Sequence, residues 1–225
     1  MEATAAKRGG ESRQELLDVA IDCFARFGYQ ATSIDRIARE AGVTKGALYY
    51  HFKDKADLLF AAVKSRVGQW ERRVIDAMRP VPSSGARLRQ VAQVCLDHAT
   101  KSNHRRMIIT LMVEALDTNA PISAEFRAMM QRFREFLATV VAGGQRHGEF
   151  RSDIDPAVAA EVYAGAVMGA EIQYYQDPNA ISLPATLDAF LDQYLGWLSA
   201  GVNHRQSNHR RTRPARAPRV RAHRS

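Results

Sequence analysis

Residues 32–55, TSIDRIAREAGVTKGALYYHFKDK, hold two short helical patterns separated by only a few residues, and this spacing constrains the fold more than any other feature. Thr32 and Ser33 are residues that cap helices, because their hydroxyls accept hydrogen bonds from free backbone N–H groups, and apolar residues follow them at helical spacing. Gly42 permits a sharp turn, and Thr44 is a second cap. The stretch therefore predicts two helices joined by a tight turn.

The second of these helices has two chemically different faces. Leu48 and Phe52 lie four residues apart, so they share one face and are expected to pack on the first helix. At about 100° per residue, the opposite side carries small, hydroxylic and cationic residues, which are Lys45, Gly46, Tyr49 and Tyr50, with Ala47 and His51 on the flank. A lysine can reach guanine acceptors or phosphate, and tyrosine hydroxyls can donate to phosphate. This polar face suits the major groove of DNA.

The whole segment resembles the DNA-binding signature of the TetR/AcrR family of bacterial repressors, T-[ST]-hydrophobic-x-x-I-A-x-x-A-G-V-[ST]-x-G-x-L-Y-x-H-F-x-x-K. The match covers nearly every position, which makes it more specific than a generic helix-turn-helix that any short helical hairpin imitates. The resemblance implies groove-facing and phosphate-facing roles, the former for Lys45, Gly46 and Tyr49 and the latter for Ser33, Thr44, Tyr50, His51 and Lys55. A plain helical hairpin is the alternative.

Helical patterns continue on both sides of this segment. Ser12 and Glu15 form a capping box before an apolar stripe, which is expected to pack against the two helices of residues 32–55. Asp54 caps a helix that keeps three-and-four spacing until Pro80, and its roughly 26 residues span about 39 Å. Further helices are expected at about 84–99, 107–116, 123–144, 156–176 and 184–198. The segment 107–116 is apolar nearly all round and predicts a central buried helix.

These patterns predict an all-α fold, in which an N-terminal three-helix DNA-binding domain of the helix-turn-helix type precedes a larger helical domain for ligand binding and dimerisation. The expected parts are a flexible arm at 1–11, the DNA-binding domain at 12–58, the effector-binding and dimerisation domain at 59–202, and a disordered tail at 203–225.

The tail carries all of the excess positive charge. It holds eight arginines and no acidic residue, so the remaining 24 basic residues equal the 24 acidic ones. Total charge is therefore no argument for DNA binding by the folded part. We expect the tail to attract phosphates without choosing a sequence, and a merely solubilising tail is the alternative.

Methionines and aromatic residues recur through the central helices, a composition typical of an adaptable apolar cavity, although plain core packing gives the same pattern. The candidate effector-binding residues are Trp70, Met107, Leu111, Phe126, Met130, Phe133 and Tyr174.

Repressors that resemble this chain dimerise by packing their last two long helices into a four-helix bundle across a two-fold axis. Gly165 and Gly169 would let a partner helix approach closely, and Phe190 and Tyr194 on the last helix would share that interface. Packing within one chain alone is the alternative.

Several classes of function lack their usual motifs. The sequence contains no HExxH, no paired CxxC, no GxSxG and no phosphate-binding glycine loop, and its seven histidines are scattered. Cys23 and Cys95 lie among apolar helical residues, which favours buried thiols over a disulfide or metal pair. No apolar run approaches the roughly 18 residues of a membrane span, and the first residues lack the apolar core of a signal peptide.

We therefore expect a cytoplasmic, homodimeric repressor that binds a pseudo-palindromic double-stranded DNA operator and is released by a small apolar effector. No cofactor, metal, membrane partner or enzymatic activity is expected. The alternatives are a DNA-binding protein with a purely structural helical body and no effector, or an enzyme domain fused to a DNA-binding module.

Overall fold

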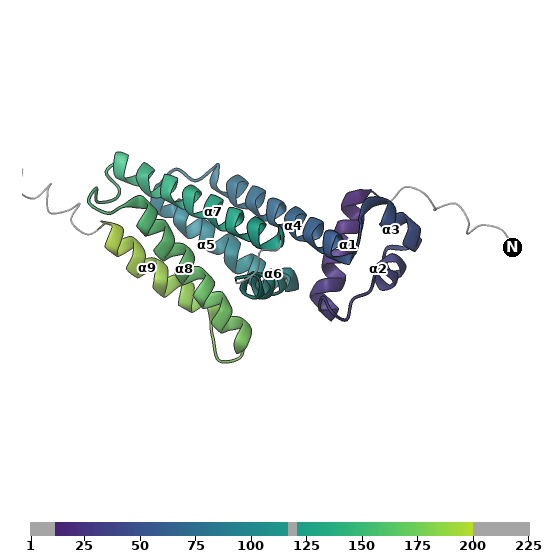
Figure 1. Cartoon of the computed structure of the whole chain (residues 1–225). Helices are drawn as coiled ribbons and strands as arrows, with labels where there is room; N and C mark the ends of the chain where they lie inside the picture. The colour runs from purple at the N-terminus through teal and green to yellow at the C-terminus, as the bar shows by residue number, and fades with distance from the viewer. Residues whose placement is uncertain (1–11, 117–120, 200–225) are drawn as a thin grey trace, which may run out of the picture.

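The computed structural model describes residues 12–116 and 121–199, and all regular structure in these two ranges is helical (Figure 1). The helices are α1 (Arg13–Phe27), α2 (Ile34–Ala41), α3 (Lys45–His51), α4 (Lys55–Met78), α5 (Ser84–Lys101), α6 (Asn103–Glu114), α7 (Pro121–Arg146), α8 (Pro156–Gln176) and α9 (Leu183–Ser199). The all-α prediction is confirmed. The arm and the arginine-rich tail expected from the sequence lie outside the described residues.

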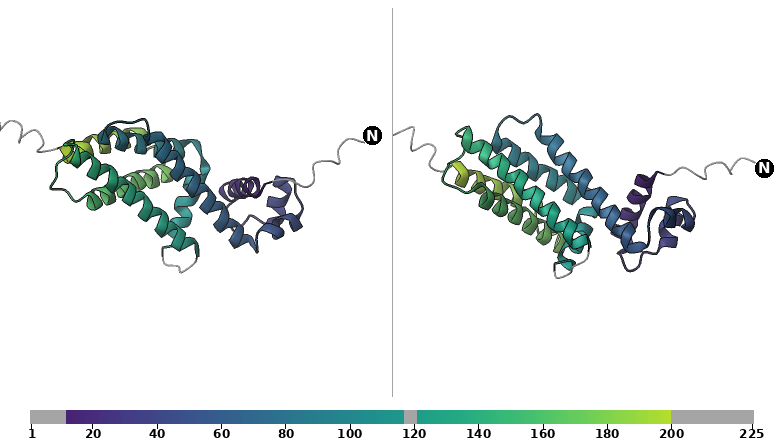
Figure 2. Two further views of the ribbon diagram at one scale, coloured as in Figure 1. Left: turned by 90° about the horizontal axis from the view of Figure 1, so that it is seen from above. Right: turned by 45° about the horizontal axis from the view of Figure 1, so that its top comes forward.

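The first three helices form a separate lobe, and α4 runs from it into a larger bundle formed by α5 to α9 (Figures 1 and 2). The capping box of Ser12 and Glu15 begins α1, as predicted. Asp54 begins α4 by accepting a hydrogen bond from the backbone N–H of Asp57. This 24-residue helix spans about 36 Å. A single rigid element therefore belongs to both parts of the molecule.

The turn between α2 and α3 has the predicted chemistry. The hydroxyl of Ser33 accepts from the backbone N–H of Arg36, and that of Thr44 accepts from Ala47, each at 3.2 Å. Gly42 has a φ of 71°, a left-handed conformation that glycine adopts without strain. Thr32 is not a cap, contrary to the prediction, because its buried hydroxyl donates to the carbonyl of Gly28 at 2.7 Å. Thr32 thus ties the end of α1 to the start of α2.

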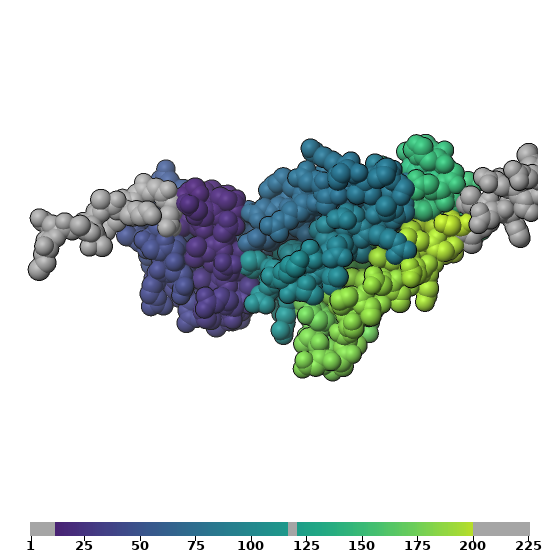
Figure 3. Space-filling view, turned by 180° about the vertical axis from the view of Figure 1, so that it is seen from behind, coloured from purple at the N-terminus to yellow at the C-terminus, as the bar shows by residue number. Residues whose placement is uncertain are grey.

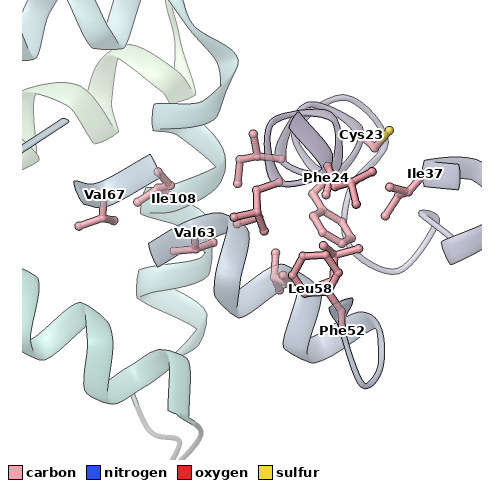
Figure 4. Packing of buried hydrophobic residues seen from close by; sticks show 14 of the residues in the cluster. Cys23, Phe24, Ile37, Phe52, Leu58, Val63, Val67 and Ile108 are labelled. Carbon is pink, nitrogen blue, oxygen red and sulfur yellow. The ribbon is translucent and has the colours of Figure 1, made fainter. Parts of the chain in front are cut away.

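The apolar core of this lobe does not stop at the end of the DNA-binding domain expected from the sequence. Figure 4 shows Phe24, Ile37 and Phe52 close together, with Leu58 beside them. The same cluster of buried residues continues along α4 and reaches Ile108 on α6 (Figure 4). Buried apolar contact is therefore continuous from the lobe into the bundle.

The prediction of a central buried helix at 107–116 is wrong. One side of α6 packs inward through Ile108, Ile109 and Met112, but Val113 is 51% exposed and Leu116, just after the helix, is 72% exposed. An apolar pattern around a whole helix does not say which neighbours will cover it, and α1 and α5 cover only part of α6. The helix is therefore a partly exposed element at the junction of the two lobes.

Helix α7 also differs from its prediction at both ends. It begins at Pro121 rather than after it, because the first turn of a helix needs no N–H donor from its first residue. It continues past the two glycines to Arg146, and Gly144 lies against the ring of the buried Phe150. The glycine permits this close approach and does not end the helix.

A buried ion pair connects α6 to α8. The guanidinium of Arg105 donates to both carboxylate oxygens of Glu171 at distances of 2.6 to 3.2 Å, and both side chains are buried. Burial lowers the pKa of Arg105, but the charge and hydrogen bonds of Glu171 outweigh burial and hold this pKa above its usual value. Arg105 is therefore charged at neutral pH.

Both cysteines are buried and unpaired with each other, as predicted. Burial is the main cause that raises the pKa of the Cys95 thiol to about 12, so this thiol stays protonated at neutral pH. Its role in the described structure is that of a small core residue.

Candidate functional site

Helix α3 presents an exposed polar face at the end of the smaller lobe (Figure 1). Tyr50 is 84% exposed and Tyr49 is 49% exposed, whereas Leu48 on the opposite side is buried in the core. The rings of Tyr50 and His51 meet in a T-shaped arrangement with centroids 4.9 Å apart. Two tyrosines held outward on a helix that is anchored by its other face can reach an external partner.

Lys45 lies at the start of this face and has an acidic partner that the sequence analysis missed. Its Nζ lies 3.1 Å from a carboxylate oxygen of Asp35 on α2, and both side chains are exposed. The hydrogen bond and charge of Asp35 raise the pKa of Lys45. The ten-residue separation gave no local signal for this pair. A phosphate or a guanine that binds Lys45 must compete with Asp35.

Gly46 is a glycine that the chain itself does not require. Its φ is not positive, and a Cβ added there would meet only the Thr44 hydroxyl at 3.8 Å, which is ordinary contact. A glycine inside a helix costs roughly 0.5–1 kcal/mol relative to alanine. Nothing within the chain therefore requires a glycine at this position.

The cap residues and Lys55 remain able to donate. Ser33 and Thr44 use their hydroxyl oxygens as acceptors in the caps, so each O–H hydrogen is still available for a phosphate. Lys55 is half-buried, and its ammonium donates to the backbone carbonyl of Tyr29 at 3.0 Å. Its Nζ also lies 4.3 Å from the centre of the Tyr29 ring. Its ammonium has three hydrogens, so further donation is possible, but its position is fixed by the chain itself.

The residues predicted to line one effector cavity do not share a single space. Trp70 and Phe133 have ring centroids 5.2 Å apart and, with Met130, line a small cavity of about 10 Å³ between α4, α6, α7 and α8. Phe126 and Met130 line a groove of about 530 Å³ that opens beside it. Met130 and Met168 belong to both spaces, so these two flexible side chains separate the cavity from the groove.

The other three candidates do not join this site. Met107 and Leu111 face a different groove, of about 860 Å³, between α1 and α6. Tyr174 lines none of these spaces and packs against Tyr175. Because α6 is turned so that its apolar outer side faces the smaller lobe, spacing along the sequence could not show that these residues lie apart.

The surface of α8 and α9 carries part of the predicted dimer interface. A Cβ added at Gly165 or Gly169 would meet nothing within 4 Å, so this side of α8 is open, and Phe190 is half-buried. Tyr194 is the exception, because its side chain is only 3% exposed and its hydroxyl donates to the carbonyl of Ala159 within the same chain. Its assignment to the dimer surface is corrected to a role in the core.

Three exposed apolar residues of this surface escaped the sequence analysis, and they are Val158, Val162 and Trp197. The signal was present for two of them, because Val158 and Val162 precede the two glycines at three-and-four spacing and so lie on the same face of α8. Figures 1 and 2 show α8 and α9 side by side along one flank of the bundle. The flank combines open glycines with exposed apolar side chains.

Metal-binding clusters and membrane-spanning helices are both absent from the described ranges. No group of three or more His, Cys, Asp or Glu side chains there is placed to hold a metal ion. None of the helices in residues 12–116 and 121–199 combines the length and the hydropathy needed to cross a membrane.

Two family models cover the two lobes. The model of bacterial regulatory proteins of the tetR family matches residues 16–62, and that of the tetracyclin repressor-like C-terminal domain matches residues 84–183. The chain belongs to the TetR family. This TetR-family protein is 27% identical over 199 residues to the HTH-type transcriptional repressor KstR2 of Rhodococcus jostii (strain RHA1), a match that covers 88% of this chain and 94% of KstR2. The TetR family member described here is therefore a DNA-binding transcriptional regulator.

Solved structures of the TetR type share the fold. A TetR transcriptional regulator from Chloroflexus aurantiacus J-10-FL has a TM-score of 0.72 at 22% identity, covering 84% of this chain and 94% of that one. The transcriptional regulator FadR from Bacillus subtilis, in complex with stearoyl-CoA, has a TM-score of 0.71 at 19% identity, covering 83% of this chain and 99% of that one. At these identities the likeness shows that the TetR fold extends over both lobes.

Proposed function

We propose that this chain is a homodimeric repressor that binds a pseudo-palindromic operator through α3 and is released by a small, largely apolar effector. The observation that carries the DNA-binding part is the outward polar face of α3, where Lys45, Tyr49 and Tyr50 stand exposed beside a glycine that the fold does not need. The name of the relative KstR2, a transcriptional repressor, supports repression.

On this proposal the residues of α3 divide into two roles. Lys45, Gly46 and Tyr49 face base edges in the major groove, and the surrounding donors hold the backbone of the DNA. These donors are Ser33, Thr44, Tyr50, His51 and Lys55. Phosphate contacts supply much of the affinity without sequence choice, so binding should weaken steeply as salt rises.

The proposal of an effector is supported by the small cavity beside Trp70 and by the structural similarity to FadR. The cavity of about 10 Å³ under Trp70 has room for about one water molecule, so a ligand must displace Met130 and Met168 and enter from the groove beside it. The indole N–H of Trp70 is buried and finds no hydrogen-bond partner among the described residues, so it can donate to an acceptor on the ligand. Since FadR binds stearoyl-CoA, acyl chains are the first class to try.

Release then needs a difference in affinity between two states. A ligand that binds both the DNA-bound and the free form equally shifts nothing, however tightly it binds. Because α4 carries Trp70 at the cavity and Leu58 in the core of the DNA-binding lobe, a shift of α4 would change the spacing of the two α3 helices in a dimer.

The relatives also support a protein without enzymatic turnover, because they include transcriptional regulators.

The experiment is a footprint and a gel-shift titration on the DNA upstream of the protein's own gene. The variant that combines Lys45→Ala with Tyr49→Ala should lose protection, because each base contact is worth about 1–3 kcal/mol of binding free energy. Lys101→Ala, an exposed lysine on α5, is the matched control and should bind as the wild type does. If the double variant binds as tightly as this control, the proposal fails.

The same titration tests the effector. Acyl-CoA thioesters of increasing chain length are added to the complex, and release of DNA is compared with stabilisation of the free protein in thermal unfolding. A ligand at about 100 times its dissociation constant should stabilise the protein by roughly 2.7 kcal/mol. If no acyl-CoA of any chain length releases the DNA or stabilises the protein, the larger helical lobe has a purely structural role.

A further inference from the structure

The largest groove described above lies between the two lobes and not within the body. It has a volume of about 860 Å³, one wall from the end of α1 and the loop after it, and the other wall from α6. Figure 3 shows the side of the molecule where α1 (purple) lies beside α6 (teal). The effector cavity proposed above is lined by other residues, so this groove is a separate space.

The groove has apolar side chains on both walls, next to polar side chains such as Gln30 and Thr110. Phe24, Phe27 and Tyr29 contribute aromatic rings from the DNA-binding lobe, and Met107 and Leu111 face them from α6. Phe27, Tyr29, Met107 and Leu111 are only partly buried by their own chain. An apolar surface of this kind gains free energy when a ligand removes it from water.

Charge is distributed unevenly along the groove. Arg106 lies near the N-terminal end of α6. Arg26 is on the wall formed by α1, with its guanidinium carbon 4.9 Å from the centre of the Phe27 ring. Neither arginine forms an ion pair within the described ranges. The N-terminal end of a helix adds partial positive charge in the same place. Glu114 lies at the other end of α6, about 12 Å from Arg106 along the helix axis. One end of the groove thus favours an anion and the other end disfavours one.

We propose that this groove binds an amphipathic monoanion, such as a medium-chain or aromatic carboxylate, with its carboxylate between Arg26 and Arg106 and its apolar part over Met107 and Leu111. A charge-assisted hydrogen bond from an arginine favours a carboxylate over a neutral or cationic head group. Glu114 at the far end selects against dicarboxylates and polyanions. The ligand class therefore differs from acyl-CoA, whose head group carries several negative charges.

Occupation of the groove acts on the orientation of the DNA-binding lobe. One wall moves with α1 and the other with α6, and the two helices are further joined by the contact of His104 on α6 with Asp22 on α1. A ligand that touches both walls favours the lobe arrangement in which the groove has its present width. This site goes beyond the proposed function and does not depend on an effector in the body.

The test uses the full chain labelled with ¹³C at its methionine methyl groups and titrated with decanoate in NMR. Met107 reports on the groove, and Met130 and Met168 report on the effector cavity. Decanoate should shift the Met107 resonance in a saturable manner and leave the other two in place. Decylamine, with the same chain and opposite charge, should not shift it.

Variants then test the head-group contact. Arg106→Glu should weaken decanoate binding about tenfold or more, because it replaces a charge-assisted hydrogen bond by repulsion. Arg72→Glu, an exposed arginine in the middle of α4, is the matched control and should change the affinity less than twofold. Both arginines are exposed, and unchanged thermal unfolding would show that both variants are folded.

Three results would overturn the inference: decanoate shifts Met130 or Met168 and not Met107, decylamine binds as well as decanoate, or Arg106→Glu binds as the wild type does. The proposed function would survive each of them, since it fails only in the DNA titration with the α3 double variant. Failure of that titration, in turn, would leave the binding of decanoate at Met107 unaffected.

Discussion

Gly144 shows how much one methyl group can matter inside this bundle. The residue lies within α7, where helix propensity alone favours alanine by roughly 0.5–1 kcal/mol. The ring of Phe150 lies so close that a Cβ at residue 144 would overlap three of its carbon atoms. Phe150 is itself only 5% exposed, so the ring has nowhere to move. Sterics therefore outweigh propensity at this residue.

We predict that Gly144→Ala destabilises the protein by about 1–3 kcal/mol, because overpacking forces buried side chains out of their preferred positions. Urea unfolding followed by circular dichroism measures the change. Gly143→Ala is the matched control, since its Cβ would meet the Ser84 hydroxyl only at 3.7 Å, and it should be neutral or slightly stabilising. Equal stability of the two variants would contradict the assignment of Gly144 to a close approach.

His98 is a second residue whose surroundings decide its state. Burial is the main cause that lowers its pKa to about 3, and the nearby positive charges of Arg105 and Arg66 lower it further. The ring is therefore neutral at physiological pH. This histidine is a partly buried, neutral residue, and its presence gives no reason to expect a metal site or an acid–base catalyst.

At the scale of elements, two consecutive residues in the first turn of α6 connect this helix to the two lobes of the molecule. Arg105 binds Glu171 on α8 in the body, and His104 contacts Asp22 on α1 of the DNA-binding lobe. Arg105 also lies over the Trp70 ring, with its guanidinium carbon 5.7 Å from the ring centre, and lines the small cavity beside this ring. A displacement at the cavity can thus reach α1 through a single helical turn.

We predict that Glu171→Leu destabilises the protein by about 3–5 kcal/mol, because it leaves the charge of Arg105 buried without a partner. Adding Arg105→Met should recover most of this loss, since a buried ion pair can be replaced by apolar side chains of similar volume at little cost. Urea unfolding of the two variants and the wild type measures both effects. A double variant as unstable as Glu171→Leu alone would show that the pair stabilises through something other than charge compensation.

At the scale of the whole molecule, the flank of α8 and α9 is the surface best suited to a second copy. Val158 and Val162 are about half exposed, and Gly165 and Gly169 leave room for a close approach along the same face. An apolar helix face of this kind is typical of a symmetric interface, in which the same patch meets itself across a two-fold axis. Such a dimer would place two copies of α3 for two half-sites of an operator.

We predict that Val162→Glu converts a dimer to a monomer, because it would bury two like charges close to the axis, and that it weakens operator binding while leaving α3 intact. Size-exclusion chromatography with light scattering measures the mass, and a gel shift measures the binding. Thr139→Glu, on the exposed side of α7, is the matched control and should remain dimeric. A wild-type protein that is monomeric at micromolar concentration would contradict the dimer proposal.

The DNA-binding lobe could be predicted closely because its signals are local. Ser33, Gly42 and Thr44 set the two caps and the turn through contacts within three or four residues along the chain, which a sequence displays directly. The two exposed tyrosines followed from the same reasoning, since Leu48 fixes which face of α3 points inward. Asp35 was missed because its contact with Lys45 depends on the angle between α2 and α3.

For the larger lobe, the sequence predicted the helices but not how they pack against one another. The sequence by itself determined an all-α chain, the reading helix and the two buried thiols, because helix caps, turns and apolar spacing act over a few residues. Only the tertiary structure decided that α6 is partly exposed, that Tyr194 is in the core, and that Met107 and Trp70 belong to different spaces. Those outcomes depend on contacts between residues tens of positions apart, such as Arg105 with Glu171, and the periodicity of one helix says which side is apolar but not which neighbour covers it.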